Sequence, residues 1–278
     1  MKKLALLFIV VLITGISFGQ KREKVRGSKN VTIEKKEIGN FENLEIEDNL
    51  EIVLIKSDKC SLEIEADDNL HNEISINANG SSLRLTTLKE VTGFKKFLVK
   101  VFYNNDFKLL LAKHESIITA TSEIVLDNFT VKSFDYSKIF MNGNVKNFTI
   151  MQNDKSKSEL NLKAETATIE LSKNAKLKAL IAATQLKVDL YQKSNAEIEG
   201  DVNEMKLRLD NSSEFNGMNL ISKTADLIAE ANTTTKINVV TNASIEASGK
   251  SEIQFYGDAK IELRKFTENT IIMKKTLK

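Results

Sequence analysis

The stretch that decides the fold runs from Phe129 to Leu209 and repeats every nineteen residues. One unit after another, it reads FTVKSFDYSKIFMNGNVKN (129–147), FTIMQNDKSKSELNLKAET (148–166), ATIELSKNAKLKALIAATQ (167–185), LKVDLYQKSNAEIEGDVNE (186–204) and MKLRL (205–209). A period of nineteen is too long for coiled-coil heptads and too short for helical hairpin repeats, which need more than about thirty residues. It suits one turn of a β-solenoid.

Apolar residues recur at fixed positions of this unit. One position holds Val131, Ile150, Ile169, Val188 and Leu207, and a neighbouring one holds Phe148, Ala167, Leu186 and Met205. Each unit begins with a four-residue strand, such as residues 168–171, in which the second and fourth side chains point inward. A second strand follows a polar corner, and its inward columns are Ile139, Ser158, Leu177, Ala196, Phe215 and, beside them, Met141, Leu160, Ala179, Ile198, Gly217.

These elements predict an all-β fold, a parallel β-helix with coils of about 19–20 residues and a spacing of ~4.8 Å. With the shorter element around Phe148, each coil has three strands and three corners, and the chain holds roughly seven or eight coils. Large and small residues alternate in the inward columns, as close packing requires: Ser158 lies beside Leu160, and Phe215 beside Gly217.

The period changes at both ends of the repeat. After residue 209 it becomes twenty, through Leu207, Leu227, Ala247 and through Met205, Ala225, Ile245, with the added residue placed at a corner. Before residue 129 the register loosens, with about two extra residues around His114.

A helical alternative exists for residues 157–190, because Ala, Lys, Leu and Glu dominate that segment and favour helix. The two-residue spacing of Ile169 with Leu171 and of Val188 with Leu190 favours strands instead. The chain has no proline, which fits continuous backbone pairing.

Short strands also fill the region before the regular repeat. Residues 41–103 alternate apolar and polar side chains in runs of four to six, as in Leu62–Glu65, and Asn79-Gly80 predicts a hairpin turn. We therefore expect a flexible lead and first strand over 20–40, an N-terminal β region of the solenoid over 41–108, regular β-helix coils over 109–262, and a closing strand and tail over 263–278. Within the lead, the first strand covers Val31–Ile33. The charged residues Glu262, Arg264 and Lys265 are expected to protect the last edge.

The first nineteen residues have the pattern of a secretory signal peptide. Lys2 and Lys3 precede an apolar run from Leu4 to Ile13, and small residues lead to a cleavage position before Gln20. The alternative, a membrane anchor, needs a longer apolar run. We expect an exported protein, in the periplasm, on the outer surface or outside the cell, with no transmembrane segment in the mature chain.

Composition excludes several functions. Without residues 1–19 the 40 basic residues fall by two to 38, equal to the 38 acidic ones, so nothing predicts nucleic-acid binding. Cys60 is the only cysteine and cannot form an internal disulfide; we expect it to be buried in a strand.

The order of segments in the N-terminal half resembles a known family. Phe41–Ile46, Glu51–Ile55, Asp68–Leu70 and Ser82–Leu85 are similar to the opening of the head GIN domain, the putative auto-transporter adhesin family. Ser194–Gly200, Gly249–Ile253 and Gln254–Asp258 are similar to its later units. The resemblance covers residues 41–262 and implies an exported β-helical protein with an adhesive or surface role. In most units the family's Ser-Gly corner is replaced, as in Asp154-Lys155-Ser156 and Lys173-Asn174-Ala175.

A search for catalytic chemistry finds few candidates. His71 and His114 lie apart, with no cysteine or histidine neighbours, and are expected to be surface or corner residues. Glu170 and Asp189 are expected to stack on adjacent coils within range of Arg208, which could form a carboxylate site of the kind used by polysaccharide lyases and hydrolases. A mixed, solvated face explains them more simply.

Two further groups suggest binding. Asp67-Asp68 and the Glu45/Glu47 pair could hold a cation, although capping and solvation explain them more simply. The column Ser137, Ser156, Ser194, Ser213 is predicted to satisfy corner amides, with a hydroxyl-rich face for glycans or a protein partner as the alternative.

The sequence thus predicts a non-catalytic exported β-solenoid that acts as an adhesin-like surface or periplasmic binding module. No catalytic, cofactor or metal residue is assigned, and the ligand, a glycan or a cell-surface protein, has no assigned residues. The alternatives are a carbohydrate-active enzyme on a β-helix and a structural envelope component that assembles end to end.

Overall fold

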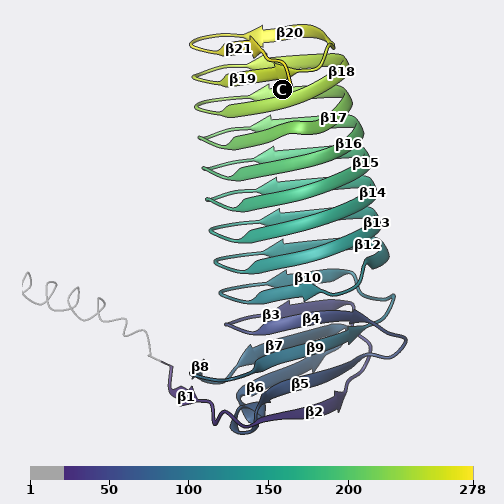
Figure 1. Ribbon diagram of the computed structural model, residues 1–278, viewed down its shortest axis with the longest axis vertical. Coiled ribbons are helices and arrows are strands. Elements are labelled where there is room, and N and C mark those ends of the chain that lie inside the picture. The colour runs from purple at the N-terminus through teal and green to yellow at the C-terminus, as the bar shows by residue number, and fades with distance from the viewer. Residues whose placement is uncertain (1–21, 278) are drawn as a thin grey trace, which may run out of the picture.

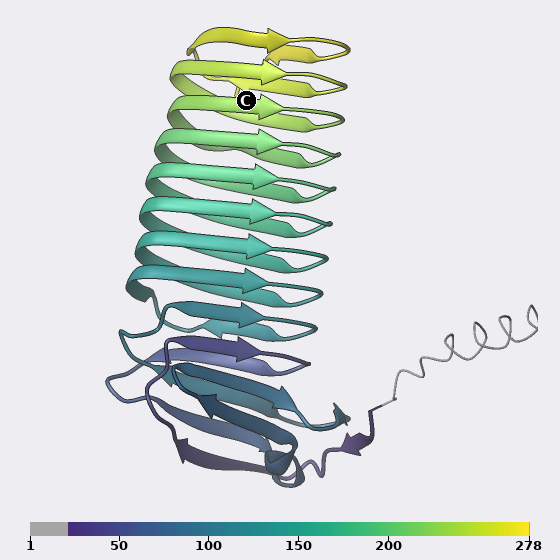
Figure 2. The ribbon, with the colours of Figure 1, turned by 180° about the vertical axis from the view of Figure 1, so that it is seen from behind.

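The computed structural model describes residues 22–277 and consists of one long rod of stacked β-coils. The predicted signal peptide lies outside these described residues. About nine turns of the chain stack as a β-solenoid, which confirms the predicted fold class and slightly exceeds the predicted number of coils. Figure 1 shows the coils above a broader N-terminal region, and Figure 2 shows the same stack from behind.

Four consecutive coils of the rod are nearly identical. Each is a single fifteen-residue strand followed by a short turn; these strands are β13 (Lys138–Gln152), β14 (Lys157–Leu171), β15 (Lys176–Leu190) and β16 (Asn195–Leu209). The prediction of three separate strands with three corners is therefore wrong in detail. The second and third elements of one unit and the first strand of the next run together, and one tight turn per coil remains.

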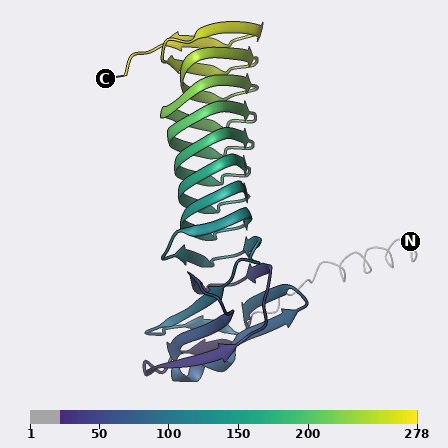
Figure 3. The same cartoon turned by 90° about the vertical axis from the view of Figure 1, so that its right-hand side faces the viewer.

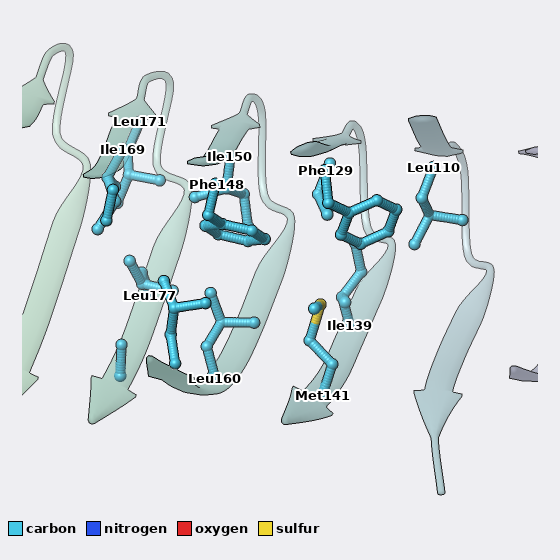
Figure 4. Packing of buried hydrophobic residues seen from close by; sticks show 14 of the residues in the cluster. Leu110, Phe129, Ile139, Met141, Phe148, Ile150, Leu160, Ile169, Leu171 and Leu177 are labelled. Carbon is cyan, nitrogen blue, oxygen red and sulfur yellow. The ribbon is translucent and has the colours of Figure 1, made fainter. Parts of the chain in front are cut away.

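The regular strands pair in parallel with a constant offset of nineteen residues. Ile150 pairs with Ile169, and Ile169 pairs with Val188, as the repeat predicts. All three side chains are fully buried and form one interior ladder. Figure 4 shows Ile150 and Ile169 in this ladder, together with the Phe129 and Phe148 rings. Burying each such aliphatic side chain contributes about 1.5–3 kcal/mol, so the continuous ladder is the main source of stability.

The coil that links the rod to its N-terminal region is built from shorter strands. They are β10 (Leu109–Ala112), β11 (Ile117–Ala120) and β12 (Ile124–Ser133). The offset is twenty-one residues for Leu109 with Thr130 and for Thr119 with Phe140, but nineteen for Ile124 with Gly143. The two extra residues therefore exist, but they lie between Thr119 and Ile124 and not around His114.

The coils after β16 contain bulges within the strands. They comprise β17 (Glu214–Ala229), β18 (Thr234–Ala247), β19 (Glu252–Tyr256), β20 (Lys260–Phe266) and β21 (Ile271–Lys274). The offset between β16 and β17 is nineteen residues at Glu197, which pairs with Asn216, and twenty at Gly200, which pairs with Leu220. The added residue of β17 therefore lies inside the strand, opposite Gly200 with its φ of 114°, and the predicted placement at a corner is wrong. Leu227 pairs with Ile245, eighteen residues on, and not with Ala247. A constant twenty-residue period does not continue because β17 contains three residues, 218–220, with no partner in β18.

The N-terminal region does not follow chain order. It contains β1 (Lys24–Arg26), β2 (Val31–Glu37), β3 (Asn43–Ile46), β4 (Glu51–Lys56), β5 (Ser61–Asp67), the 3-10 helix η1 (Asp68–Glu73), β6 (Ile74–Asn79), β7 (Ser82–Thr87), β8 (Glu90–Thr92) and β9 (Phe97–Tyr103). The first coil, β3 with β4, lies between β10 and β11 on one side and the later strands β7 and β9 on the other. The chain thus completes one coil, folds a base beneath it, and returns to build the second coil on top.

Antiparallel strands close this base. β5 pairs with β9, β2 pairs with β5, and β6 pairs with β7 across the Asn79-Gly80 turn, which confirms the predicted hairpin. β2 includes the strand predicted at Val31–Ile33. Ahead of it, in the stretch predicted to be flexible, β1 pairs in parallel with β8. Cys60 is buried, as predicted, but it lies one residue before β5.

Candidate functional site

The two-residue turns of successive coils line up along one edge of the rod and line an open groove of about 780 Å³. We call this the turn-edge groove. Five turns line it, and their residues are Asp135, Tyr136, Asp154, Lys155, Lys173, Asn174, Gln192, Lys193, Asn211 and Ser212. The turns form the left-hand edge of the rod in Figure 1.

The backbone of these turns is left-handed although none of them contains glycine. Asp135 and Asp154 have φ values of 59°, and the next three turns have two such residues each: Lys173 with Asn174, Gln192 with Lys193, and Asn211 with Ser212. Left-handed backbone costs most residues about 1–2 kcal/mol, and glycine escapes this cost. The corners are thus as tight as glycine corners but carry full side chains.

Hydrogen bonds between neighbouring turns keep the groove wall regular. The amide of Asn174 donates to the carbonyl of Gln192 at 3.1 Å, and the amide of Lys193 donates to the carbonyl of Asn211 at 2.9 Å. Because these backbone groups are fixed by the next coil, the side chains project from a rigid support.

One end of the groove combines an aromatic ring with a cation. Tyr136 is 55% exposed, and the Lys155 ammonium lies 5.1 Å from the centre of its ring and 3.1 Å from its hydroxyl. Lys173 lies 3.8 Å from Asp154, whereas Lys155 and Lys193 have no carboxylate partner within residues 22–277. The groove therefore offers an exposed ring, amide groups, carboxylates and unneutralised ammonium groups along five coils.

The predicted carboxylate pair is stacked but not assembled into a reactive site. Glu170 and Asp189 are register partners, and Arg208 follows on the next coil. The Asp189 carboxylate pairs with Lys187 of its own strand at 2.8 Å, and its hydrogen bond raises the pKa of that ammonium; Arg208 contacts Glu230 at 3.2 Å. Asp189 and Arg208 are thus engaged with other partners, as a mixed solvated face requires.

The acidic pairs considered as cation ligands already have partners from the protein. Glu47 accepts hydrogen bonds from Arg84 at 2.5 Å and Lys113 at 3.0 Å, and Lys113 also contacts Glu45 at 2.5 Å. Burial raises the pKa of Glu47, but these two hydrogen bonds outweigh it, so the pKa lies below its usual value.

Asp67 is enclosed by backbone amides. Its fully buried carboxylate accepts from the amides of Lys29, Lys95 and Lys96, and Asp68 accepts from Ser28 and Asn30. Burial raises the pKa of Asp67, and the three amides bring it below its usual value. These acids fasten the segment before β2 to the base. No group of three potential metal ligands occurs in the part of the chain that the structure describes.

The serine column is structural, and the alternative of a hydroxyl-rich face is wrong for it. Ser137, Ser156, Ser194 and Ser213 are at most 1% exposed. The hydroxyls of Ser137 and Ser156 each donate at 2.8 Å to the carbonyl three residues before, within the turn. Ser137 and Ser156 therefore satisfy turn carbonyls rather than the amides that were predicted. The Ser213 hydroxyl donates to the Leu190 carbonyl at 3.1 Å, and the Ser194 hydroxyl has no partner among the described residues.

The two histidines have different environments. His114 lies at a turn with a φ of 56°, as predicted for a corner residue. His71 is 8% exposed within η1, so a surface position is wrong; its Nε2 lies 2.8 Å from the Thr32 hydroxyl. Packing of β2 over η1 buries the ring.

Sequence reasoning did not identify the groove residues Tyr136, Lys155 and Gln192. The sequence does contain one indication of these residues. Tight turns favour glycine, yet none of the two-residue turns that line the groove contains one. Their sequences differ from coil to coil, so the nineteen-residue period gives no indication of their role.

Comparisons with known proteins agree with the architecture. A solved putative adhesin from Parabacteroides distasonis ATCC 8503 is 17% identical, with a TM-score of 0.63 over 91% of this chain and 98% of that one. A putative lipid binding protein from the same organism is 15% identical, with a TM-score of 0.62 over 92% and 100%. A putative adhesin from Parabacteroides merdae ATCC 43184 is 18% identical, with a TM-score of 0.55 over 92% and 98%. At these identities the likeness concerns the fold.

Proteins with curated functions give no match to this chain. Within residues 22–277, no helix has the length and hydropathy needed to span a bilayer. The family model described as "putative auto-transporter adhesin, head GIN domain" matches residues 40–259, and the chain belongs to that family.

Proposed function

We propose that this protein is an exported, non-catalytic binding module that holds an extended glycan in the turn-edge groove. The observation that carries the proposal is that five successive turns present polar side chains, among them Lys173, Gln192 and Lys193, in one groove beside the exposed ring of Tyr136. Left-handed turns without glycine also occur at Asp48, His114, Ala231 and Glu268, outside the groove, so the backbone conformation belongs to the whole turn edge. The groove differs in the long polar and aromatic side chains that five successive turns present together.

The chemistry of the groove suits a sugar chain. A sugar ring has apolar faces that pack on an aromatic side chain and hydroxyl groups that exchange hydrogen bonds with amides and carboxylates. Tyr136 supplies the exposed ring, Asn174 and Gln192 supply amides, and Asp154 supplies a carboxylate. Lys155 and Lys193 add positive charge that favours acidic sugars.

The regular geometry suits a repeating ligand. Five turns spaced by ~4.8 Å extend over about 19 Å, so a polymer contacts several turns at once. Because the groove is held by backbone pairing, little ordering entropy is lost on binding. Weak contacts on successive coils then add up along one chain.

A glycan array with the purified protein tests the proposal. We expect binding to acidic oligosaccharides that falls at least about tenfold in Tyr136→Ala and in Lys155→Ala. Phe94→Ala and Lys176→Ala are matched controls, because both side chains are exposed but lie outside the groove; they should bind like the parent protein.

Other outcomes overturn specific parts of the proposal. Binding that survives both groove variants and is lost in the controls would move the site elsewhere. Degradation of a polysaccharide that stops in Glu170→Gln or Asp189→Asn would establish an enzyme in place of a binding module. Capture of a cell-surface protein by the groove, with no glycan bound, would replace the ligand class. Cell fractionation tests export, and a protein found only in the cytoplasm would refute this part of the proposal.

A further inference from the structure

The last coil of the rod leaves apolar interior side chains open to solvent. Ile261, Leu263 and Phe266 continue the interior columns of Ala243, Ile245 and Ala247, which are at most 2% exposed. In the last coil the same columns are 38%, 49% and 39% exposed. The hydrophobic core is thus open to solvent at the C-terminal end of the rod.

The backbone edge of this coil is also open. β20 pairs only with β18, and β21 pairs only with β19, among the strands of residues 22–277. Figure 3 shows the chain after β21 leaving the rod sideways, so it does not cover the end. A partner of this surface has to fill apolar contacts and also pair with N–H and C=O groups.

This double requirement selects among occupants. A lipid surface would accept the apolar side chains but leave the strand edge without hydrogen-bond partners, at a cost of several kcal/mol for each buried polar group. The edge of another β-coil supplies both kinds of contact. We propose that the occupant is a second copy of this chain, bound end to end through β20 under a twofold axis.

The charges of β20 suit pairing with itself. When two β20 strands run antiparallel about Leu263, Glu262 of one copy lies opposite Arg264 of the other, and Lys265 lies one position further along, opposite Ile261. Glu262 has no ion-pair partner among the described residues, whereas Arg264 contacts Asp226 and Glu246 on its own rod. The contact therefore pairs an unused acid with a cationic segment twice, once on each side of the axis.

The charges near this edge, which the sequence predicted to be protective, do not cover its apolar side chains. Arg264 reaches back along the rod toward Asp226, and Leu263 remains half exposed. The register shift around Arg264 limits how far pairing extends, which favours one closed contact over a continuous sheet.

The opposite end of the rod does not match this surface. Its edge strand β2 carries four consecutive charged residues, Glu34, Lys35, Lys36 and Glu37. Ile33, which is 60% exposed, is the one large apolar side chain of β2 that is mostly exposed. β20 therefore has a row of three exposed apolar side chains that β2 lacks, which favours contact between two C-terminal ends. The assembly closes as a dimer and does not continue as a filament.

Sedimentation velocity of the purified protein tests the dimer. We expect a concentration-dependent dimer whose Kd rises at least about tenfold in Leu263→Glu, while Ile33→Glu at the other end leaves it unchanged. Both side chains are exposed, so both variants should fold; circular dichroism checks this.

Cross-linking tests the geometry. In a Cys60→Ser background, Leu263→Cys should form a disulfide-linked dimer under mild oxidation, because the two residues meet on the axis. Ile33→Cys should not. A protein that stays monomeric at about 1 mM overturns the proposal, as does cross-linking between positions 33 and 263. Sedimentation with anionic phosphatidylserine vesicles that is lost in Leu263→Glu, without any dimer in solution, would establish a membrane contact in its place.

Discussion

Replacing the strained turn residues by glycine should make the protein more stable and bind its ligand less well. Lys173, Gln192 and Lys193 have φ values of 48°, 51° and 63°, in the region that glycine adopts without steric cost. The relevant variants are Lys173→Gly, Gln192→Gly, Lys193→Gly and the triple substitution.

The expected gain follows from two opposing terms. Relief of left-handed strain returns about 1–2 kcal/mol per residue. Glycine lowers stability by about 0.5–1 kcal/mol because its unfolded chain is more flexible. Lys173 also loses an exposed contact with Asp154 at 3.8 Å, which is worth less than about 1 kcal/mol. The net gain is about 0.5–1 kcal/mol per site and roughly 1.5–3 kcal/mol for the triple variant.

Urea unfolding and thermal melting measure this gain. The triple variant should melt roughly 3–12 °C higher, since 1 kcal/mol shifts the Tm of a chain this long by about 2–4 °C. Lys176→Gly is the matched control, because this exposed lysine is the first residue of strand β15 and is paired on both sides, so its replacement should lower stability. A triple variant less stable than the parent would refute the assignment of strain. A stabilised variant that keeps full glycan binding would refute the groove as the binding site.

Three other perturbations test the remaining architecture. Gly200→Ala should lower stability by at least about 2 kcal/mol, because φ is 114° and the new Cβ would lie 2.1 Å from the Ile181 carbonyl oxygen; Gly39→Ala, with open space around it, should be nearly neutral in the same urea titration. Phe148→Ala, which removes a fully buried ring next to Phe129, should cost about 3–5 kcal/mol, and a loss below 1 kcal/mol would contradict the packing of Figure 4. Burial raises the pKa of Glu47, but Arg84 and Lys113 lower it by more, so the pKa in the folded protein lies below the ordinary value of 4.5. Ionised Glu47 therefore stabilises the fold at pH values above 4.5, and this contribution is lost as the pH falls through the folded pKa. The Tm should therefore drop less steeply on acidification in Arg84→Met than in the parent, and parallel curves would exclude a role for this ion pair.

The regular part of the rod could be predicted because the sequence period equals the offset between paired residues of neighbouring coils. In a parallel coil of constant length, residues one period apart become register partners, as Ile150, Ile169 and Val188 do. The same reasoning identified Ser158 beside Leu160 and Phe215 beside Gly217 as complementary pairs. A Cβ on Gly217 would lie 2.4 Å from the Phe215 ring, so the small residue is required there.

The period fails where pairing departs from chain order. β3 and β4 pair with β10 and β11, strands that are sixty-six residues further on at Leu44 and Leu110, and no local repeat encodes that distance. Bulges have the same effect, because the extra residues in β17 lie inside a strand. Gly200 and Gly217 stand beside two of the irregularities, but a glycine alone does not give the number of residues added. The candidate site was missed for a related reason. Its residues share a place on the rod and a backbone conformation, not a residue type.

The core explains why the rod can hold such turns at all. The coil that contains Gln192 and Lys193 also buries Val188, Leu190 and Ile198 completely, and each contributes about 1.5–3 kcal/mol. Two left-handed residues cost about 2–4 kcal/mol, which this burial exceeds. Folding therefore tolerates the lysine and glutamine of the turn but does not require them, because glycine satisfies the same backbone with less strain. The same backbone occurs at Asp48, His114, Ala231 and Glu268, so left-handed turns are a property of the stack, and only the side chains that they carry distinguish the proposed groove.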